Sequence, residues 1–291
     1  MPELNLSFHT SFSLKKEEIL QIIKVAEEEE KGTKDSKKNL MAKTGLGNKK
    51  VSPVKTWSIR SGLVDRETGK LTPQGAIARK HDPYLQSPVT DWLMHFQLSL
   101  SEEGLKEKDK PQTPDERAIP ANFGGWQWFI FTFLPNHQNF SRNTLDHAAN
   151  QIYETDNKKA KSISDDLLKV LKAYTDKKDT LAQISFLKSS AKDQYIAGEA
   201  TLPPDELIAY FLAKICERDF QSLSQINSDR LLQHPYGLAP ILGISTDKVQ
   251  DLLDHLSGKG IIEQYKTVPP FQIIPRWNEP LDLLEKAYVN N

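Results

Sequence analysis

The chain has 291 residues, of which 38% are hydrophobic and 26% are charged, a composition that suits a polar globular protein of about two or three domains. No apolar run reaches the roughly 18 residues of a membrane-spanning helix, so the sequence predicts no membrane partner. The single cysteine, Cys216, excludes an internal disulfide framework and a zinc site built on several thiolates. It favours a buried thiol in a cytoplasmic protein.

The formal net charge of −1 conceals an uneven distribution along the chain. Residues 1–30 carry three lysines and seven glutamates, a net charge of −4. Residues 31–80 carry thirteen Lys or Arg against three Asp or Glu, a net charge of +10. Residues 199–291 carry eight basic and thirteen acidic side chains, a net charge of −5. A block as cationic as the second one attracts polyanions, whatever the charge of the whole chain.

The N-terminal quarter predicts three helices followed by a hairpin. Apolar residues at helical spacing indicate an amphipathic helix over residues 15–30. A short helix that ends near Gly45 follows, and then a helix that begins near Ser52, is capped by Asn48 and stops at Gly62. Residues 63–71 read as strand, turn and strand. This order of elements is that of a winged helix-turn-helix.

The middle of the chain predicts helices around an apolar segment. Residues 124–134 form the most apolar stretch and are expected to be core, with Trp92, Trp126 and Trp128 as packing residues. His95 is expected to be a hydrogen-bonded core residue rather than a metal ligand. The helices expected in this region cover residues 82–99, with a start broken by Pro83 and Pro88, 142–152 with Ser141 as the cap, and 164–175. Residues 101–120 are expected to form a surface loop or a partly disordered connection.

The C-terminal third repeats the N-terminal pattern. After a helix over residues 203–219, a short helix, a turn at Gly243 and a helix over residues 246–257 precede strands at 261–265 and 271–274. The predicted fold is therefore mainly α (α+β), with two winged helix-turn-helix units joined by a helical middle domain. The domain boundaries are 1–80, 81–200 and 201–291.

Cations on and around the second helix-turn-helix element of the first unit predict contact with nucleic acid. Because phosphates supply most of the affinity for nucleic acid, we expect contact with the backbone of double-stranded DNA and weak sequence preference. The alternative is a solvated basic face without a ligand. The residues expected to contact DNA are Lys43, Lys49, Lys50, Lys55, Arg60, Arg66 and Lys70.

The second unit has the opposite charge on the corresponding helix. Asp247, Asp251 and Asp254 would repel phosphate, so this unit is expected to contact protein, either another domain or a second copy of the chain. Self-association through the C-terminal winged helix is the resulting expectation.

No established catalytic or metal-binding motif occurs, since the chain lacks HExxH, P-loop, GxGxxG and GxSxG patterns. The best loosely assembled candidates for acid–base chemistry are His9, His81 and Asp82, because they flank the basic unit. The alternative is that all three are structural. No metal site is predicted, and a cofactor stays unknown, with a divalent metal implied only if the protein nicks DNA.

Four segments share an order with a known family: FHTSFSLKKEEIL (8–20), LTPQGAIARKHDPYLQSPVTDWLMHFQL (71–98), WQWFIFTFLPNHQNFSRNTL (126–145) and LPPDELIAYFL (202–212). Together they resemble the blocks of the domain-of-unknown-function 4007 family, which include a His-x-x-Phe start matched by His9 and Phe12. The resemblance covers about residues 4–275. The linker at 106–120 is longer and more charged than the family pattern, and no catalytic motif matches residue by residue.

That family resembles the SspB component of single-strand DNA phosphorothioation systems in phage-defence clusters. The resemblance implies a DNA-binding component with sulfur-transfer proteins as partners, and nicking of one strand that gives the sulfur-inserting enzymes access. Two other functions fit the sequence: a winged-helix transcriptional regulator, and a non-catalytic scaffold for the sulfur-transfer enzymes.

Overall fold

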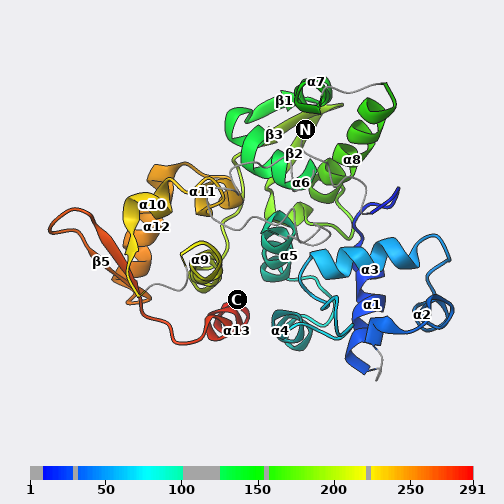
Figure 1. Ribbon diagram of the computed structural model, residues 1–291, viewed down its shortest axis with the longest axis horizontal. Helices are drawn as coiled ribbons and strands as arrows, with labels where there is room; N and C mark the ends of the chain where they lie inside the picture. The colour runs from blue at the N-terminus through cyan, green and yellow to red at the C-terminus, as the bar shows by residue number, and fades with distance from the viewer. Residues whose placement is uncertain (1–8, 29–31, 101–124, 154–156, 221–223, 291) are drawn as a thin grey trace.

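The computed structural model describes residues 9–28, 32–100, 125–153, 157–220 and 224–290. The described chain is mainly helical and contains two small antiparallel three-stranded sheets (Figure 1). The predicted α+β class, dominated by helices, is therefore confirmed. The surface loop expected at 101–120 lies outside the described residues.

Three helices form the start of the chain, as expected. α1 (Lys16–Glu28) buries its apolar stripe against α2 (Lys37–Thr44) and α3 (Val51–Arg60). Gly45 ends α2 in the left-handed conformation (φ 68°), which glycine adopts without steric cost. The predicted cap Asn48 is wrong, because the residue that precedes α3 is Lys50 and no side chain caps this helix.

The hairpin expected over residues 63–71 is reduced to a single bridge between Val64 and Leu71. Asp65 closes the turn by accepting hydrogen bonds from the backbone N and the Oγ1 of Thr68, at 2.6 and 2.7 Å. A helix that the sequence analysis missed follows at once, α4 (Pro73–His81), capped by Thr72. The predicted strands are thus reduced to one bridge around the turn, and α4 follows them.

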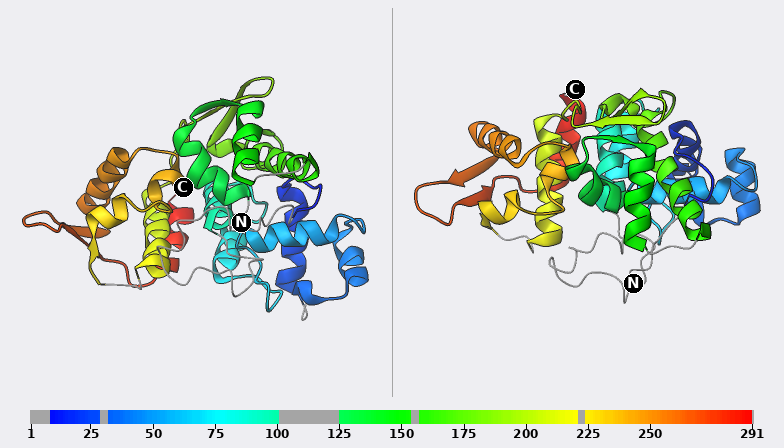
Figure 2. Two further views of the ribbon diagram at one scale, coloured as in Figure 1. Left: turned by 45° about the horizontal axis from the view of Figure 1, so that its top comes forward. Right: turned by 90° about the horizontal axis from the view of Figure 1, so that it is seen from above.

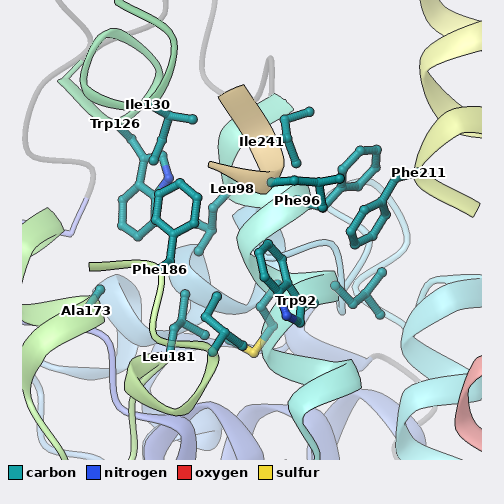
Figure 3. Close-up of a cluster of buried hydrophobic side chains, with 14 of the residues drawn as sticks. Trp92, Phe96, Leu98, Trp126, Ile130, Ala173, Leu181, Phe186, Phe211 and Ile241 are labelled. Atoms are coloured by element: carbon teal, nitrogen blue, oxygen red, sulfur yellow. The ribbon is translucent and has the colours of Figure 1, made fainter. Parts of the chain in front are cut away.

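α5 (Pro88–Leu100) is the central helix of the molecule (Figure 1). Its side chains contact distant parts of the sequence: Trp92 packs edge-on against Phe186, which precedes β2 (Leu187–Ala191), and Phe96 stacks on Phe211 of α9 with ring centroids 4.2 Å apart (Figure 3). Trp126 lies in a continuous helical segment that consists of α6 (Gly125–Trp128), the π-helical turn η5 (Phe129–Phe133) and the 3₁₀ turn η6 (Leu134–Asn136). The predicted burial of this segment and of the tryptophans is confirmed.

A three-stranded sheet lies in the middle region, which is therefore not purely helical. Its order is β1 (Asn139–Ser141), β3 (Gln194–Ala197), β2 (Leu187–Ala191). The sheet was missed because β2 exposes four of its five residues and so lacks alternation between apolar and polar positions. Between β1 and β2 run α7 (Arg142–Tyr153), α8 (Asn157–Thr175) and the 3₁₀ turn η7 (Ala182–Ile184). The helix start at Ser141 is confirmed, since its Oγ accepts from Thr144 N at 3.1 Å.

The C-terminal third has the expected elements and three more. α9 (Asp205–Asp219), α11 (Leu238–Leu242), α12 (Thr246–Gly258), β5 (Ile262–Tyr265) and β6 (Gln272–Pro275) match the prediction. β4 (Ile226–Asn227), α10 (Ser228–Leu232) and α13 (Pro280–Val289) were not predicted. The sheet order is β4-β6-β5, and the β5–β6 hairpin projects from the body (Figure 2). α13 packs on both α9 and α4, so the end of the chain contacts its first third.

Candidate nucleic-acid interface

Three cationic side chains from separate elements meet beside η1 (Gly32–Lys34): Lys34 of η1, Lys55 of α3 and Arg66 of the turn after α3. Lys34 and Arg66 are exposed, and Lys55 is half-buried with its Nζ donating to Thr33 O at 2.5 Å. We call these three residues the cationic cluster. They are far apart in sequence, so only the fold brings their charges together.

A close contact between two backbones holds the cluster in place. Thr33 N donates to Gly69 O at 2.8 Å, which joins η1 to the turn that carries Arg66. Gly32 (φ 50°) and Gly69 (φ 71°) both occupy the left-handed region. A Cβ on Gly32 would lie 2.2 Å from Gly69 O, so a larger residue would push the two segments apart. The glycines therefore position the cations.

The charges of the cluster act on Lys55, while Lys34 also interacts with the neighbouring carboxylate of Asp65. Burial lowers the pKa of Lys55, and the positive charges of Arg66 and Lys34 lower it further. Each effect reports that the ammonium form is destabilised at this position. A phosphate among the three side chains would remove the repulsion between them, which is the electrostatic requirement for an anion site.

The residues predicted to bind DNA differ in exposure. Lys43, Lys49 and Arg66 are exposed, whereas Lys50, Lys55 and Lys70 are half-buried. Lys43 pairs with Asp35 at 2.8 Å, and Lys50 pairs with Glu18 at 2.5 Å.

Arg60 is only 5% exposed. A phosphate would have to displace packed side chains to reach its guanidinium group, so we leave Arg60 out of the proposed interface. Lys34 was missed because residues 31–38 read as a polar connector. The high basic content of that connector was the available signal.

His9 is held inside the fold. Its ring is 1% exposed and stacks on Trp57 with centroids 5.5 Å apart. Its Nε2 lies 2.9 Å from Asp166 Oδ1, and its Nδ1 lies 2.9 Å from Thr10 O. These contacts fix the N-terminal segment against α3 and α8.

His81 and Asp82 lie at the end of α4. The Nε2 of His81 is 3.2 Å from Glu285 Oε1, and its ring stacks on Tyr288 of α13. Asp82 accepts hydrogen bonds from the backbone N of Gln86 and of Ser87, both at 2.8 Å, and from Thr90 Oγ1 at 2.6 Å. His81 and Asp82 thus contact α13 and the start of α5, whereas His9 contacts α3 and α8.

The exposed face of α12 is acidic, as its sequence indicated. Asp247, Asp251 and Asp254 are all exposed. Asp254 accepts from Lys266 Nζ, and this hydrogen bond lowers the pKa of the carboxyl group. Asp205 accepts from both Lys259 and, at 3.0 Å, His255. The local cations are thus paired with carboxylates of the same unit.

Within the described residues, no group of three or more His, Cys, Asp or Glu side chains is arranged to hold a metal ion. The described part of the chain also has no helix with the length and hydropathy needed to cross a membrane.

Comparisons with known proteins identify one family and one fold. The family model of DUF4007, proteins of unknown function, matches residues 6–268. A magnesium-ion-bound crystal structure of SspB is similar, with a TM-score of 0.70 at 14% identity over 99% of this chain and 88% of that one. A second SspB crystal structure has a TM-score of 0.69 at 15% identity over the same shares. No curated protein sequence matches the chain.

Proposed function

The chain belongs to the DUF4007 family, and from this membership and its SspB-like fold we propose that it is a DNA-binding component of a phosphorothioate modification system for phage defence. The observation that carries the DNA-binding part is the cationic cluster of Lys34, Lys55 and Arg66. Phosphates are the anions that a nucleic acid offers at regular spacing, and lysine and arginine bind them without reading sequence.

The proposed fold assignment is two winged helix-turn-helix units. Residues 226–275 have the order strand, three helices, strand, strand, with the three strands in one sheet. Residues 16–71 have three helices followed by a wing reduced to one bridge. We propose domains at 1–80, 81–200 and 201–291, with the first contacting DNA.

The second unit is proposed to contact protein. Its exposed carboxylates on α12 disfavour phosphate, and the projecting β5–β6 hairpin exposes Tyr265 and Val268 (Figure 2). Sulfur-transfer proteins of the same system, or a second copy of the chain, are the proposed partners.

Binding to short DNA duplexes of unrelated sequence tests the function. We expect similar affinities for all sequences and a steep loss of affinity with salt, because phosphate contacts release counterions. Tight binding to one sequence that resists salt would instead identify a transcriptional regulator. A protein that binds no duplex but binds a sulfur-transfer enzyme would be a scaffold.

Nicking of one strand is the finer part of the proposal. Among the candidate groups, the side chain of His81 is 20% exposed, so we assign the acid–base role to it before the buried His9. Supercoiled plasmid with and without magnesium should yield relaxed circles, and His81→Ala should slow their formation without changing the affinity for DNA. Full activity in both His81→Ala and His9→Ala would remove the assignment. A wild-type protein that leaves the plasmid supercoiled would have a purely binding role.

A further inference from the structure

A pocket lies apart from the cationic cluster, since none of the three cations of the cluster lines it. It has a volume of about 590 Å³ and is lined by the first turns of α1, by residues 84–86 between α4 and α5, and by residues 177–183 after α8. This volume falls within the range of about 300–1,000 Å³ of small-molecule sites. None of the functions discussed above uses it.

The loop that forms one wall is rigid and presents an aromatic ring to solvent. Asp82 fixes this loop by accepting from Gln86 N, Ser87 N and Thr90 Oγ1. Leu85 is fully buried and has a left-handed backbone (φ 54°), a conformation that is costly for leucine. Its neighbour Tyr84 is left 69% exposed at the pocket. The loop thus holds an exposed ring in one place.

The other two walls are cross-linked to each other and to this loop. Lys16 N donates to Asp179 O at 2.8 Å, which joins α1 to the segment after α8. Gln183 Nε2 donates to Gln86 O at 2.9 Å, which joins that segment to the Tyr84 loop. Asp179 is a second non-glycine residue with a positive φ, 57°. The pocket is therefore formed before any ligand binds, which lowers the entropic cost of binding.

The charges of the pocket favour a neutral polar ligand over a phosphate. The Nζ of Lys16 donates to Oδ1 of the fully buried Asp91 at 2.7 Å, so this ammonium group is engaged inside the protein. The other charged residues that line the pocket are Lys177, Glu17 and Asp179. Two carboxylates against one ammonium would repel a bare phosphate group. The same carboxylates, with the side-chain amide of Gln86, suit the donors and acceptors on the edge of a nucleobase.

We propose that this pocket binds one unpaired nucleobase, stacked on Tyr84 and read at its edge by the amide and carboxylate groups of the walls. The proposal rests on the proposed DNA-binding function and names a second, base-directed contact within it. The two sites share α1, because Glu17 lines the pocket and Glu18 pairs with Lys50 of the basic unit. Tyrosine stacks on any base, so the site tolerates different bases.

Two single-stranded oligonucleotides of equal length test this pocket, one of thymidines and one wholly abasic with the same phosphates. Fluorescence anisotropy should show wild-type protein binding the thymidine strand at least about fivefold more tightly, since one base stacked on an aromatic ring contributes that much or more. Tyr84→Ala should abolish the difference and Tyr84→Phe should keep it. Leu202→Ala is the control, because Leu202 is also an exposed hydrophobic side chain (40%) and does not line the pocket.

Equal affinity of the wild-type protein for the two strands would overturn the proposal that the pocket binds a base. The proposed binding to the DNA backbone would be unaffected. If neither strand binds, the duplex measurement decides the proposed function separately. The pocket is then tested by saturation-transfer NMR with the four free deoxynucleosides. Transfer that disappears in Tyr84→Ala would identify a free nucleoside or nucleotide as the source of the base, and no transfer would overturn the proposal.

Discussion

Removing two charges from the cationic cluster should change how DNA affinity depends on salt. If Lys34, Lys55 and Arg66 each contact one phosphate, they contribute about −2.7 to the slope of log affinity against log salt concentration. Raising the salt from about 50 to 200 mM would then weaken binding roughly 40-fold through these contacts. The double variant Lys34→Ala/Arg66→Ala keeps one contact, so the same change should weaken it only about 3.5-fold through the cluster. Anisotropy titrations with one labelled duplex at several salt concentrations measure both slopes.

The control removes a cation that the structure places on the acidic unit. Lys248 is exposed on α12, so Lys248→Ala should leave the slope unchanged. The melting temperature of all variants should match the wild type, because Lys34 and Arg66 are exposed. A double variant that folds normally and keeps the wild-type slope would show that the cluster does not contact phosphate, and the main argument for DNA binding would be refuted.

Three predictions concern stability and are measured by urea unfolding. Trp126→Ala should lower the free energy of unfolding by about 3–5 kcal/mol, because the buried side chain (3% exposed) leaves a cavity; normal stability would show that Trp126 is not a core residue. Burial lowers the pKa of His95 to about 4. Lowering the pH from about 6.5 to 4 therefore protonates this histidine in the unfolded chain first and should lower the free energy of unfolding by up to about 3 kcal/mol. His95→Gln should make the free energy of unfolding less dependent on pH in this range, and an unchanged dependence would contradict the lowered pKa of His95. Burial raises the pKa of Asp91 to about 7 despite its pairing with Lys16. The folded protein therefore holds this proton more tightly than the unfolded chain, and the free energy of unfolding falls as the pH rises from about 4 to 7. Asp91→Asn should remove that loss, and wild type and variant with the same pH dependence of the free energy of unfolding would contradict the prediction.

The elements that the sequence predicted well have caps and apolar periodicity of their own. α12 follows Ser245, whose Oγ accepts from Lys248 N, and its buried residues Val249, Leu253 and Leu256 follow helical spacing. α4 lacks such a stripe, since only Gly75 and Ala78 of its nine residues are buried. The Thr72-Pro73 start was the available signal for α4, because threonine caps helices and proline favours the first turn. Elements with little apolar surface thus need their tertiary neighbours to be recognised.

The candidate sites also combine features that the local sequence predicts with features that only tertiary contacts produce. Net charge located the cationic region, but it could not show that Lys34 joins Lys55 and Arg66, because a tertiary contact between Gly32 and Gly69 brings them together. Nor could the sequence distinguish the roles of Asp82 and Tyr84, two residues of the DPYL segment. The carboxylate of Asp82 accepts hydrogen bonds within its own loop. The same loop leaves the ring of Tyr84 exposed.

The burial of α3 bears on which function the basic unit can have. A helix that reads bases in a groove must offer polar side chains along one exposed face. Of the ten residues of α3, seven are buried, and Ser52 is the one classed as exposed. The exposed cations of this unit lie on η1, on α2, on the loop before α3 and on the turn after it. Cations carried by such segments bind phosphates but do not present a row of base-reading groups. The geometry therefore favours sequence-tolerant contact with the DNA backbone over operator recognition by a regulator.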